Sequence, residues 1–274
     1  MILITGDMGF IGTHFKEAVK NEEGILMDIK RDSVGIMGIT PESLKGVDTI
    51  FHFAALPKVP ISIEDPIATH VENVNATLHL LWCAKEAGVK RFIYSASSSV
   101  YGVQNTLPLT EDMKPNPMSP YAAQKLMGEY YCKIFSELYG IETVCLRYFN
   151  VYGENMPTDG YAAAIAKFKQ QKADGKKLTV YGGEQTRDFT YVGDVVEANL
   201  LAWKSKRKWN GEIINIGSGK NYSITDIAKA IGGIISFYSP RKGEAQDTRA
   251  DISKANELLG WKPKTDVIKW LKCK

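Results

Sequence analysis

The sequence ILITGDMGFIG, residues 2–12, decides the fold of this chain. Its first four residues are apolar and predict a short buried strand, and residues 11–21 follow as an amphipathic helix. Three glycines stand between the strand and the helix. Gly6 permits a tight turn, Gly9 lets the backbone approach an anion at the helix N-terminus, and Gly12 allows close helix–strand packing. The spacing therefore predicts a strand–turn–helix unit that can hold a pyrophosphate.

Strand-like and helix-like segments alternate from this unit up to residue 150. We expect strands at 24–29, 49–55, 91–96 and 142–147, with long helices at 71–87 and 120–139. Alternation of this kind is typical of parallel strands joined by crossover helices. The sequence predicts an α/β fold, a Rossmann-type doubly wound parallel sheet with helices on both faces.

The pattern becomes irregular beyond residue 150. A helix at 161–173, a strand in KLTVYG, a helix at 192–203 and a strand in EIINIG follow, then small helices around a strand near 236–238. No linker-like stretch separates the two parts of the chain. We predict an NAD-binding Rossmann domain at residues 1–149, to which 189–215 return, and a smaller, interleaved substrate-binding lobe over 150–274.

Composition and charge exclude several classes of protein. The 274 residues are 44% hydrophobic and 24% charged, which argues against disorder. The 34 Lys and Arg against 31 Asp and Glu leave a formal charge of +3, too balanced to indicate a nucleic-acid partner. No apolar run approaches the ~20 residues that span a bilayer. We therefore expect neither nucleic acid nor membrane as a partner.

Cysteines and histidines form no metal-binding pattern. No CxxC pair occurs among Cys83, Cys132, Cys145 and Cys273, and His14, His52, His70 and His79 form no cluster. We expect no metal site and no disulfide framework, and interpret the histidines as structural or surface residues. Free thiols fit a reducing compartment, so a cytoplasmic location is expected.

An acid at the end of the second predicted strand completes a dinucleotide-binding pattern. Asp28 stands about 20 residues beyond the first glycine, as the fingerprint requires. Its carboxylate suits the ribose hydroxyls of NAD and would repel the 2′-phosphate of NADP. Lys30 and Arg31 leave the alternative open, because an Arg past the acid can accommodate that phosphate. We predict NAD.

Two further motifs follow in the chain. SASSSVYG at 95–102 comes after a predicted strand, and YAAQK at 121–125 opens a predicted helix. With the GxxGxxG turn, they resemble the extended short-chain dehydrogenase/reductase superfamily. Together with other matching segments, they resemble its NAD-dependent nucleotide-sugar epimerase/dehydratase family along nearly the whole chain. Those segments are FHFAA at 51–55, RYFNVYG at 147–153, TRDFTYVGDV at 186–195 and ADISKANELLGW at 250–261.

The resemblance implies three catalytic residues. Tyr121 is the implied base that takes a proton from a sugar hydroxyl, Lys125 lowers its pKa and holds the nicotinamide ribose, and Ser97 hydrogen-bonds the reacting oxygen. A positive charge one helical turn away stabilises a phenolate, so the spacing suits this chemistry. The resemblance also implies tightly bound NAD. Its contacts would be Gly6, Gly9, Phe10, Ile11, Gly12, Asp28, Phe53, Ala54, Ala55, Asn73, Tyr121, Lys125 and Tyr148.

The residues after Ser97 bear on the reaction. Ser98 and Ser99 stand where the family's dehydratases and decarboxylase carry acids. Without a carboxylate there, the simplest outcome is that the keto sugar takes the hydride back on its other face, which is 4-epimerisation. Two alternatives stay open: an oxidoreductase acting on nucleotide sugars with NAD(P), and a non-catalytic dinucleotide-binding sensor. Sensors commonly lose the Tyr or the Lys, whereas both are present here.

A UDP-hexose is the implied substrate. Arg187 and Arg241 match two arginines that grip the nucleotide diphosphate, for which a planar guanidinium is suited. Asn150 and Ser98 belong to the implied substrate site. Thr248 matches a position against the sugar's C2 substituent, where a residue smaller than Tyr suits UDP-GlcNAc and UDP-GalNAc beside UDP-Glc and UDP-Gal. The alternative is that Thr248 faces water on a loop.

Departures from the family pattern occur in two places. The stretch 29–47 is short, with VGIMG at 34–38 as the remnant of a further strand, and little of the usual final helix remains at the C-terminus. Family members commonly dimerise through two helices, here 71–87 and 120–139. Their outer faces offer Leu78, Trp82, Met127 and Tyr131, so we expect a homodimer built on a four-helix bundle.

Overall fold

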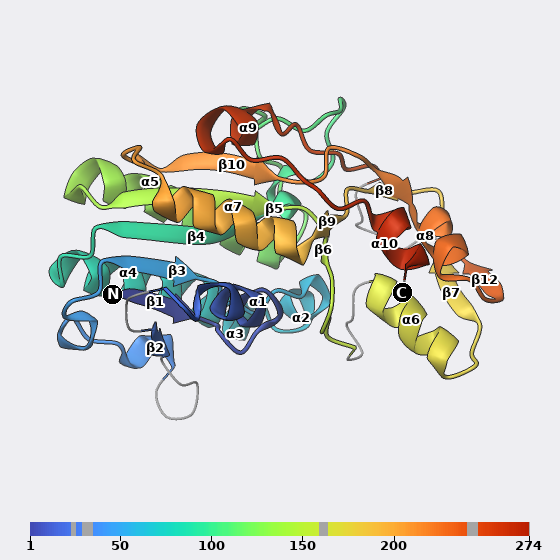
Figure 1. Cartoon of the computed structure of the whole chain (residues 1–274), viewed down its shortest axis with the longest axis horizontal. Coiled ribbons are helices and arrows are strands. Elements are labelled where there is room, and N and C mark those ends of the chain that lie inside the picture. The colour runs from blue at the N-terminus through green and yellow to red at the C-terminus, as the bar shows by residue number, and fades with distance from the viewer. Residues whose placement is uncertain (23–25, 29–34, 159–163, 240–245, 274) are drawn as a thin grey trace.

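Six parallel strands form the central sheet of the computed structural model, which describes residues 1–22, 26–28, 35–158, 164–239 and 246–273 (Figure 1). The strands lie in the order β10–β5–β4–β3–β1–β2, and every neighbouring pair is parallel. Ligands of such sheets bind outside the carboxyl ends of the strands where the strand order reverses, here between β1 and β3. The predicted fold class is confirmed. The bounds are β1 Ile2–Thr5, β2 Leu26–Asp28, β3 Thr49–His52, β4 Arg91–Ser97, β5 Glu142–Tyr148 and β10 Glu212–Ile216.

Helices cover both faces of this sheet. On one face pack α1 (Phe10–Val19), α7 (Val192–Lys204) and α9 (Ser253–Leu259); Figure 1 shows α1 and α7 in front of the strands. On the other face pack α4 (Ala76–Glu86) and α5 (Pro120–Tyr139). Burial on both sides explains why the strands read as short continuous apolar runs. Within the described residues, no helix is long and apolar enough to cross a membrane.

The helix expected at 71–87 begins earlier and is not uniform. α3 (Pro66–His70) leads through a π-helical segment, Val71–Asn75, into α4. The Asp65 carboxylate accepts a hydrogen bond from the backbone N–H of Ala68 at 2.9 Å and caps α3. A preceding helix that the pattern did not predict, α2 (Val59–Glu64), packs on α5.

Three other expectations need correction. The strand expected at 49–55 ends at His52, because the backbone at Ala54 leaves the sheet and crosses the turn at Gly6. VGIMG is not a remnant strand: Ile36–Gly38 form a 3₁₀ turn, while residue 34 lies outside the described residues, as do 29–33 with Lys30 and Arg31. A short final helix is present, α10 (Val267–Lys272).

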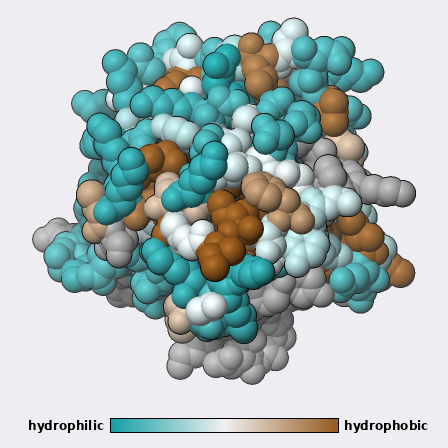
Figure 2. Space-filling view, turned by 90° about the vertical axis from the view of Figure 1, so that its right-hand side faces the viewer, coloured by the Kyte–Doolittle hydropathy of each residue, from teal (hydrophilic) through white to brown (hydrophobic). Residues whose placement is uncertain are grey.

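A smaller lobe lies beyond one end of the sheet (Figure 1). Its core is shared by α6 (Ala164–Ala173), α8 (Ile224–Ile231), α10 and the parallel pair β7 (Leu178–Tyr181) and β12 (Ile235–Tyr238). Figure 2 shows the outer face of this lobe, where hydrophobic patches are separated by hydrophilic side chains. Scattered patches of this kind are ordinary for a water-facing surface. Two short ladders complete the lobe: β6 (Val151–Tyr152) with β9 (Thr190–Tyr191), and β8 (Thr186–Arg187) with β11 (Tyr222–Ser223).

The chain passes more than once between the sheet and the lobe. β10 pairs with β5, and α7 packs on α1, so these later segments lie with the large sheet. α9 also packs on β10. The division into 1–149 with 189–215, and 150–274, stays a prediction.

A buried carboxylate joins the lobe to the sheet. Asp188 follows β8, is 0% exposed, and accepts hydrogen bonds from the backbone N–H and the hydroxyl of Ser218 at 2.6 and 2.7 Å. The backbone N–H groups of Gly219 and Ala250 donate to it at 3.0 Å each. Burial raises the pKa of Asp188, and these hydrogen bonds lower it. The interaction places Arg187 beside the segment that follows β10.

Candidate active site

The turn after β1 is packed too tightly for side chains at two of its three glycines. Gly6 has φ +72°, and a Cβ there would lie 2.6 Å from the backbone nitrogen of Ala54. A Cβ on Gly12 would lie 2.1 Å from the Gly6 carbonyl oxygen. At Gly9, which has φ −77° and begins α1 without a side-chain cap, the same oxygen at 3.0 Å is the one close contact among the described residues. The space over Gly9 and the first turn of α1 therefore fits a pyrophosphate.

The other predicted cofactor contacts differ in where their side chains lie. Phe53 and Ile11 pack against the core, and the Phe53 ring lies 5.3 Å from that of Phe15. The Tyr148 hydroxyl points into the protein, where it donates to Asn199 Oδ1 at 3.0 Å. Ala54 lies against the glycine turn, and Ala55 follows it there. Phe10 packs edge-on against His14, and Asp28 ends β2 opposite Ile4 of β1.

A buried hydrogen-bond chain that the sequence analysis missed supports the turn. The Thr77 hydroxyl donates to the Asn73 carbonyl at 2.8 Å, so its oxygen accepts from His52 Nε2 at 2.8 Å. Nδ1 of His52 then accepts from the Thr5 hydroxyl at 2.7 Å. Burial, with a smaller effect of Lys125, lowers the pKa of His52 to about 3, so the ring is neutral. The chain connects the end of β1 to the π-helical segment.

The Asn73 side chain is committed to the protein. Its Oδ1 accepts from the Leu56 backbone N–H at 2.7 Å, and its Nδ2 donates to Gln124 Oε1 at 2.8 Å. Gln124 lies on α5, between Tyr121 and Lys125 in sequence. Asn73 thus ties the loop after β3 to the helix that carries the predicted catalytic pair.

Ser97 and Tyr121 meet at the carboxyl end of β4. Ser97 accepts hydrogen bonds from the Ser99 backbone N–H at 3.2 Å and from the Ser99 hydroxyl at 2.9 Å. Its own proton is thereby free to donate to another oxygen, and the Ser97 side chain lowers the pKa of Tyr121. The backbone N–H of Tyr121, at the start of α5, donates to Ser62 Oγ of α2 at 3.1 Å. Ser62 lies outside every predicted motif, and Ser99 was noted only as a residue without a carboxylate.

Lys125 lies one turn further along α5. Its Nζ donates to the Ser95 carbonyl at 2.8 Å and lies 4.9 Å from the centroid of the Tyr94 ring. Burial lowers the pKa of Lys125 to about 8, and neighbouring groups including Glu129 raise it. The buried ammonium group of Lys125 therefore loses its proton only slightly above neutral pH.

Burial opposes the predicted lowering of the Tyr121 pKa by Lys125, and the net shift is upward. Burial raises the pKa of Tyr121 to about 12, and the hydrogen bond from Ser97 lowers it. The sequence motif identifies the pair but does not reveal that the phenol is only 8% exposed. Desolvation of the phenolate outweighs the nearby donor.

The predicted substrate residues gather around β8. The Arg187 guanidinium donates to the carbonyls of Thr186 and Gln246 at 2.9 and 3.3 Å. Thr248 is 9% exposed, and its hydroxyl accepts from the Asp188 backbone N–H at 3.3 Å, so it does not face water on a loop. Asn150 Nδ2 donates to the Asp188 carbonyl at 3.0 Å. Ser98 is half-buried in the 3₁₀ turn Ser98–Tyr101, and Arg241 lies outside the described residues.

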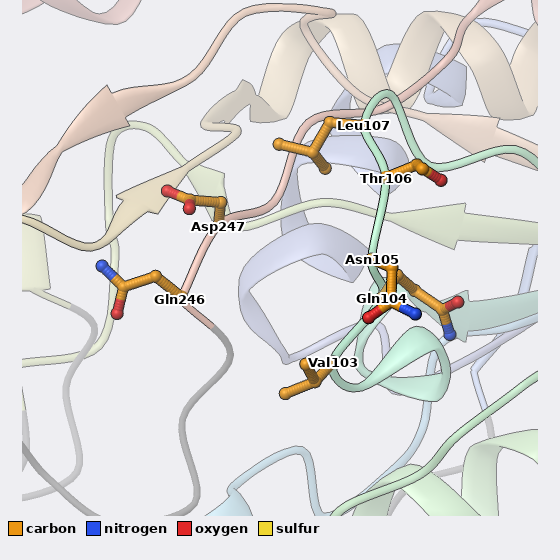
Figure 3. Close-up of a pocket in the computed structure, with 7 residues that line it drawn as sticks. All are labelled: Val103, Gln104, Asn105, Thr106, Leu107, Gln246 and Asp247. Atoms are coloured by element: carbon orange, nitrogen blue, oxygen red, sulfur yellow. The ribbon is translucent and has the colours of Figure 1, made fainter.

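A cavity of about 310 Å³ opens next to these residues (Figure 3). The loop from Val103 to Leu107 forms one wall, and Gln246 and Asp247 form the other. Gln246 contacts Arg187, and Asp247 accepts a hydrogen bond from the Thr186 hydroxyl at 2.5 Å. Ser97, Tyr121 and Lys125 do not line this cavity, so it belongs to the surroundings of β8. The described residues contain no group of three or more His, Cys, Asp or Glu side chains that could hold a metal ion.

A family model described as the NAD dependent epimerase/dehydratase family matches residues 2–217. The chain belongs to this family. NAD is accordingly its cofactor, and the chain is an enzyme of this family. A putative UDP-glucose 4-epimerase from Methanocaldococcus jannaschii is 35% identical over 99% of this chain and 98% of its own length.

Two solved structures resemble the whole chain. UDP-N-acetylglucosamine 4-epimerase from Methanobrevibacter ruminantium M1, in complex with UDP-N-acetylmuramic acid, has a TM-score of 0.90 at 34% identity, over 99% of this chain and 95% of that one. UDP-glucuronic acid 4-epimerase from Bacillus cereus, in complex with UDP-glucuronic acid and NAD, has a TM-score of 0.90 at 31% identity, over 99% and 96%. These relatives are all named 4-epimerases and differ in their sugar.

The glycine turn yields a prediction for cofactor binding. Gly9→Ala should fold with a small change in thermal stability, because φ −77° suits alanine and a single contact must relax. Its methyl group would occupy the space for the pyrophosphate, so the Kd for NAD should rise at least about tenfold. Calorimetric titration with NAD and thermal unfolding measure the two effects. Gly12→Ala is the contrast and should lose both stability and binding; an unchanged Kd for Gly9→Ala would contradict the placement.

Proposed function

We propose that this enzyme interconverts the C4 epimers of a UDP-hexose, with UDP-glucose and UDP-galactose as substrates and the N-acetylated pair beside them. One observation carries the proposal. Ser97, Tyr121 and Lys125 converge at the carboxyl end of β4, while Ser98 and Ser99 supply hydroxyls where elimination or decarboxylation would employ a carboxylate. The names of the relatives support the same reaction.

The chain's own residues move one proton and hold one charge. Tyr121 takes the proton of the C4 hydroxyl, and Ser97 donates a hydrogen bond to the C4 oxygen. The Lys125 ammonium favours the phenolate form of Tyr121. Ser99 supports this role, since its hydroxyl donates to Ser97 and frees the Ser97 proton. NAD, when bound, supplies reversible oxidation at C4. The glycine turn and Ala54 would hold it, with Lys125 at its ribose.

Return of the sugar to the opposite configuration needs a second binding pose. The UDP moiety would stay fixed while the hexose turns about its link to the diphosphate. Arg187, with Arg241, is suited to hold the diphosphate through bidentate hydrogen bonds. Asp188 supports Arg187 in this task, since its buried carboxylate fixes the adjoining backbone to the segment after β10. A fixed anchor and a rotating sugar give epimerisation without further catalytic groups.

The catalytic assignment is tested by Tyr121→Phe. Turnover of UDP-galactose should fall at least ~10²-fold, because the general base is removed. Binding of the UDP-sugar, measured by calorimetry, should persist. Tyr130→Phe is the matched control on the same helix, since Tyr130 is 56% exposed. Near-normal turnover in Tyr121→Phe removes the residue from the mechanism.

The same assay separates the proposed function from its alternatives. A panel of UDP-glucose, UDP-galactose, UDP-GlcNAc, UDP-GalNAc and UDP-glucuronic acid is incubated with the enzyme, and epimers and NADH are both measured. Epimer formation without NADH beyond one equivalent of enzyme supports an epimerase. Net NADH production indicates an oxidoreductase, and binding without either product indicates a sensor.

The range of sugars is tested at Thr248. Thr248→Tyr should sharply reduce turnover of UDP-GlcNAc and UDP-GalNAc and spare UDP-galactose, because added volume would exclude the acetamido group. Thr248→Val keeps the volume, loses the hydroxyl that accepts from the Asp188 N–H, and should retain both activities. If Thr248→Tyr lowers both pairs equally, or neither, the sugar range is set elsewhere.

We also propose a homodimer through α4 and α5. Of the four residues predicted for its interface, Trp82 and Met127 are 46% and 40% exposed, whereas Leu78 and Tyr131 pack partly into the core. Ile134 and Leu138, 42% and 69% exposed, extend the Met127 stripe along one face of α5. A water-exposed apolar stripe of this kind indicates a helical partner.

Light scattering tests the dimer. The unmodified protein should have twice the mass of one chain at micromolar concentration. Ile134→Lys combined with Leu138→Lys should give monomers, because two charges would be buried in the interface. Ile234→Lys, at a residue 69% exposed after α8, is the matched control and should remain a dimer. A monomeric unmodified protein would refute the proposal.

A further inference from the structure

Three ionisable side chains occupy successive turns of α5. Tyr121, Lys125 and Glu129 are spaced by four residues, so they share one face of the helix. They are 8%, 3% and 1% exposed. This face rests on β4 and β5, to which α5 makes close contacts. The third member of this series has no part in the chemistry described above.

Glu129 is clamped inside the core by Arg147 of β5. Arg147 Nε lies 2.8 Å from Oε1 of Glu129, and Nη2 lies 2.7 Å from Oε2, which is a bidentate pair. The two side chains are 0% and 1% exposed. The guanidinium lies 4.6 Å from the centroid of the Tyr101 ring, and its Nη1 has no hydrogen-bond partner among the described residues. Such a pair fixes the direction and position of the carboxylate.

The carboxylate serves two buried cations. Lys125 and Arg147 both lie away from water. Glu129 is paired with Arg147 and lies one helical turn beyond Lys125, whose pKa is raised by Cys132 and by Glu129. Burial raises the pKa of Glu129, whereas the hydrogen bond and charge of Arg147 and the charge of Lys125 lower it. The negative charge of Glu129 would balance the positive charge of Arg147 if no other cation were buried there. The excess cation is Lys125, whose charge survives burial only with an anion nearby.

Several ionisable groups on α5 and the neighbouring strands surround Lys125. The ionisable side chains near Lys125 come from α5 and from three strands. They are Tyr121, Glu129 and Cys132 on α5, Tyr94 on β4, Cys145 and Arg147 on β5, and His52 on β3. Burial raises the pKa of Tyr94 and of Cys145 well above their usual values, so both stay neutral. Among these described groups, Glu129 is the one carboxylate.

We propose that Glu129 is a positioning residue: its carboxylate, held by Arg147, keeps Lys125 as an ammonium ion one helical turn from Tyr121. The proposal deepens the proposed function, on whose Tyr121–Lys125 pair it rests. It explains why an ion pair is buried behind the site, where two apolar side chains would pack as well. It also separates two tasks, since Lys125 acts on the phenolate and Glu129 acts on Lys125.

Titration of Lys125 tests the proposal directly. In the NAD-loaded protein labelled with ¹³C at lysine Cε, the Lys125 signal is assigned by its loss in Lys125→Met, and its midpoint is followed by NMR. Glu129→Gln should lower the midpoint by about one pH unit or more, the usual effect of removing a close opposite charge. Glu129→Asp, which keeps the carboxylate, should restore it. Glu137→Gln removes a charge from the exposed face of α5, where Glu137 pairs with Lys133, and should leave the midpoint unchanged.

The pH dependence of kcat/KM provides the second readout. Its alkaline limb should move down with the Lys125 midpoint in Glu129→Gln and stay in place in Glu137→Gln. If Glu129→Gln does not fold, Glu129→Gln with Arg147→Gln removes both buried charges and should still lower the midpoint. An unchanged midpoint in the variant that folds overturns the proposal. A lowered midpoint with an unmoved alkaline limb supports it and instead refutes the role of Lys125 in the proposed function.

Discussion

Burial of charge against α5 is the constraint on which the centre of this protein depends. A charge removed from water needs an opposite charge and filled hydrogen-bond positions, or it is lost by titration. The Glu129–Arg147 pair meets this condition with two short hydrogen bonds, and Lys125 meets it with the Ser95 carbonyl and the same carboxylate nearby. The spacing of residues on α5 and the register of β4 against β5 are both fixed by this requirement. A helix rotated by one residue would move Glu129 away from Arg147 and leave the buried guanidinium without its partner.

The lobe depends on a second buried carboxylate. Asp188 accepts four hydrogen bonds from Ser218, Gly219 and Ala250, which come from two separate segments of the chain. These hydrogen bonds bring Arg187 and Thr248 to one place although they are far apart in sequence. These two predicted substrate residues are therefore positioned by hydrogen bonds to the backbone. This leaves the surface beside Gln246 and Asp247 free to form a cavity.

The sequence predicted those parts of the structure that depend on interactions between residues close together in the chain. The glycine spacing predicted the turn that Gly6 and Gly12 require, and the four-residue spacing placed Tyr121 and Lys125 on one face of α5. Hydrogen bonds between distant segments were missed. The Ser62 hydroxyl accepts from the Tyr121 backbone N–H, and the hydroxyls of Thr5 and Thr77 bind the two ring nitrogens of His52. Each of these is an ordinary hydroxyl whose partner is chosen by the tertiary fold. They leave no trace in spacing or composition.

A related limit applies to pKa values. Tyr121 and Lys125 were predicted as a pair, but the net upward shift of the Tyr121 pKa was not foreseen, because a motif carries no information on how deeply a phenol is buried. Glu129 could have been found from sequence, since YAAQKLMGE places an acid two turns beyond Tyr121 on a face that must be apolar elsewhere. An acid in such a position is rare without a buried partner. The partner, Arg147, lies in the RYFN segment, in which roles were predicted only for Tyr148 and Asn150.

Lys125 shows that this arrangement serves chemistry and not stability. Its pKa falls from 10.5 to about 8 in the folded protein, chiefly through burial. Between these two values the unfolded chain binds a proton that the folded chain has released, so the contribution of Lys125 to stability rises with pH across that window. Below the lower value both states are protonated, and the folded protein bears the full cost of a buried ammonium ion. That is the pH range in which Lys125 carries the positive charge that the proposed mechanism requires. The side chain is thus held in its least stable setting under the conditions where its charge is useful, which is the expected mark of a functional group and not of a structural one.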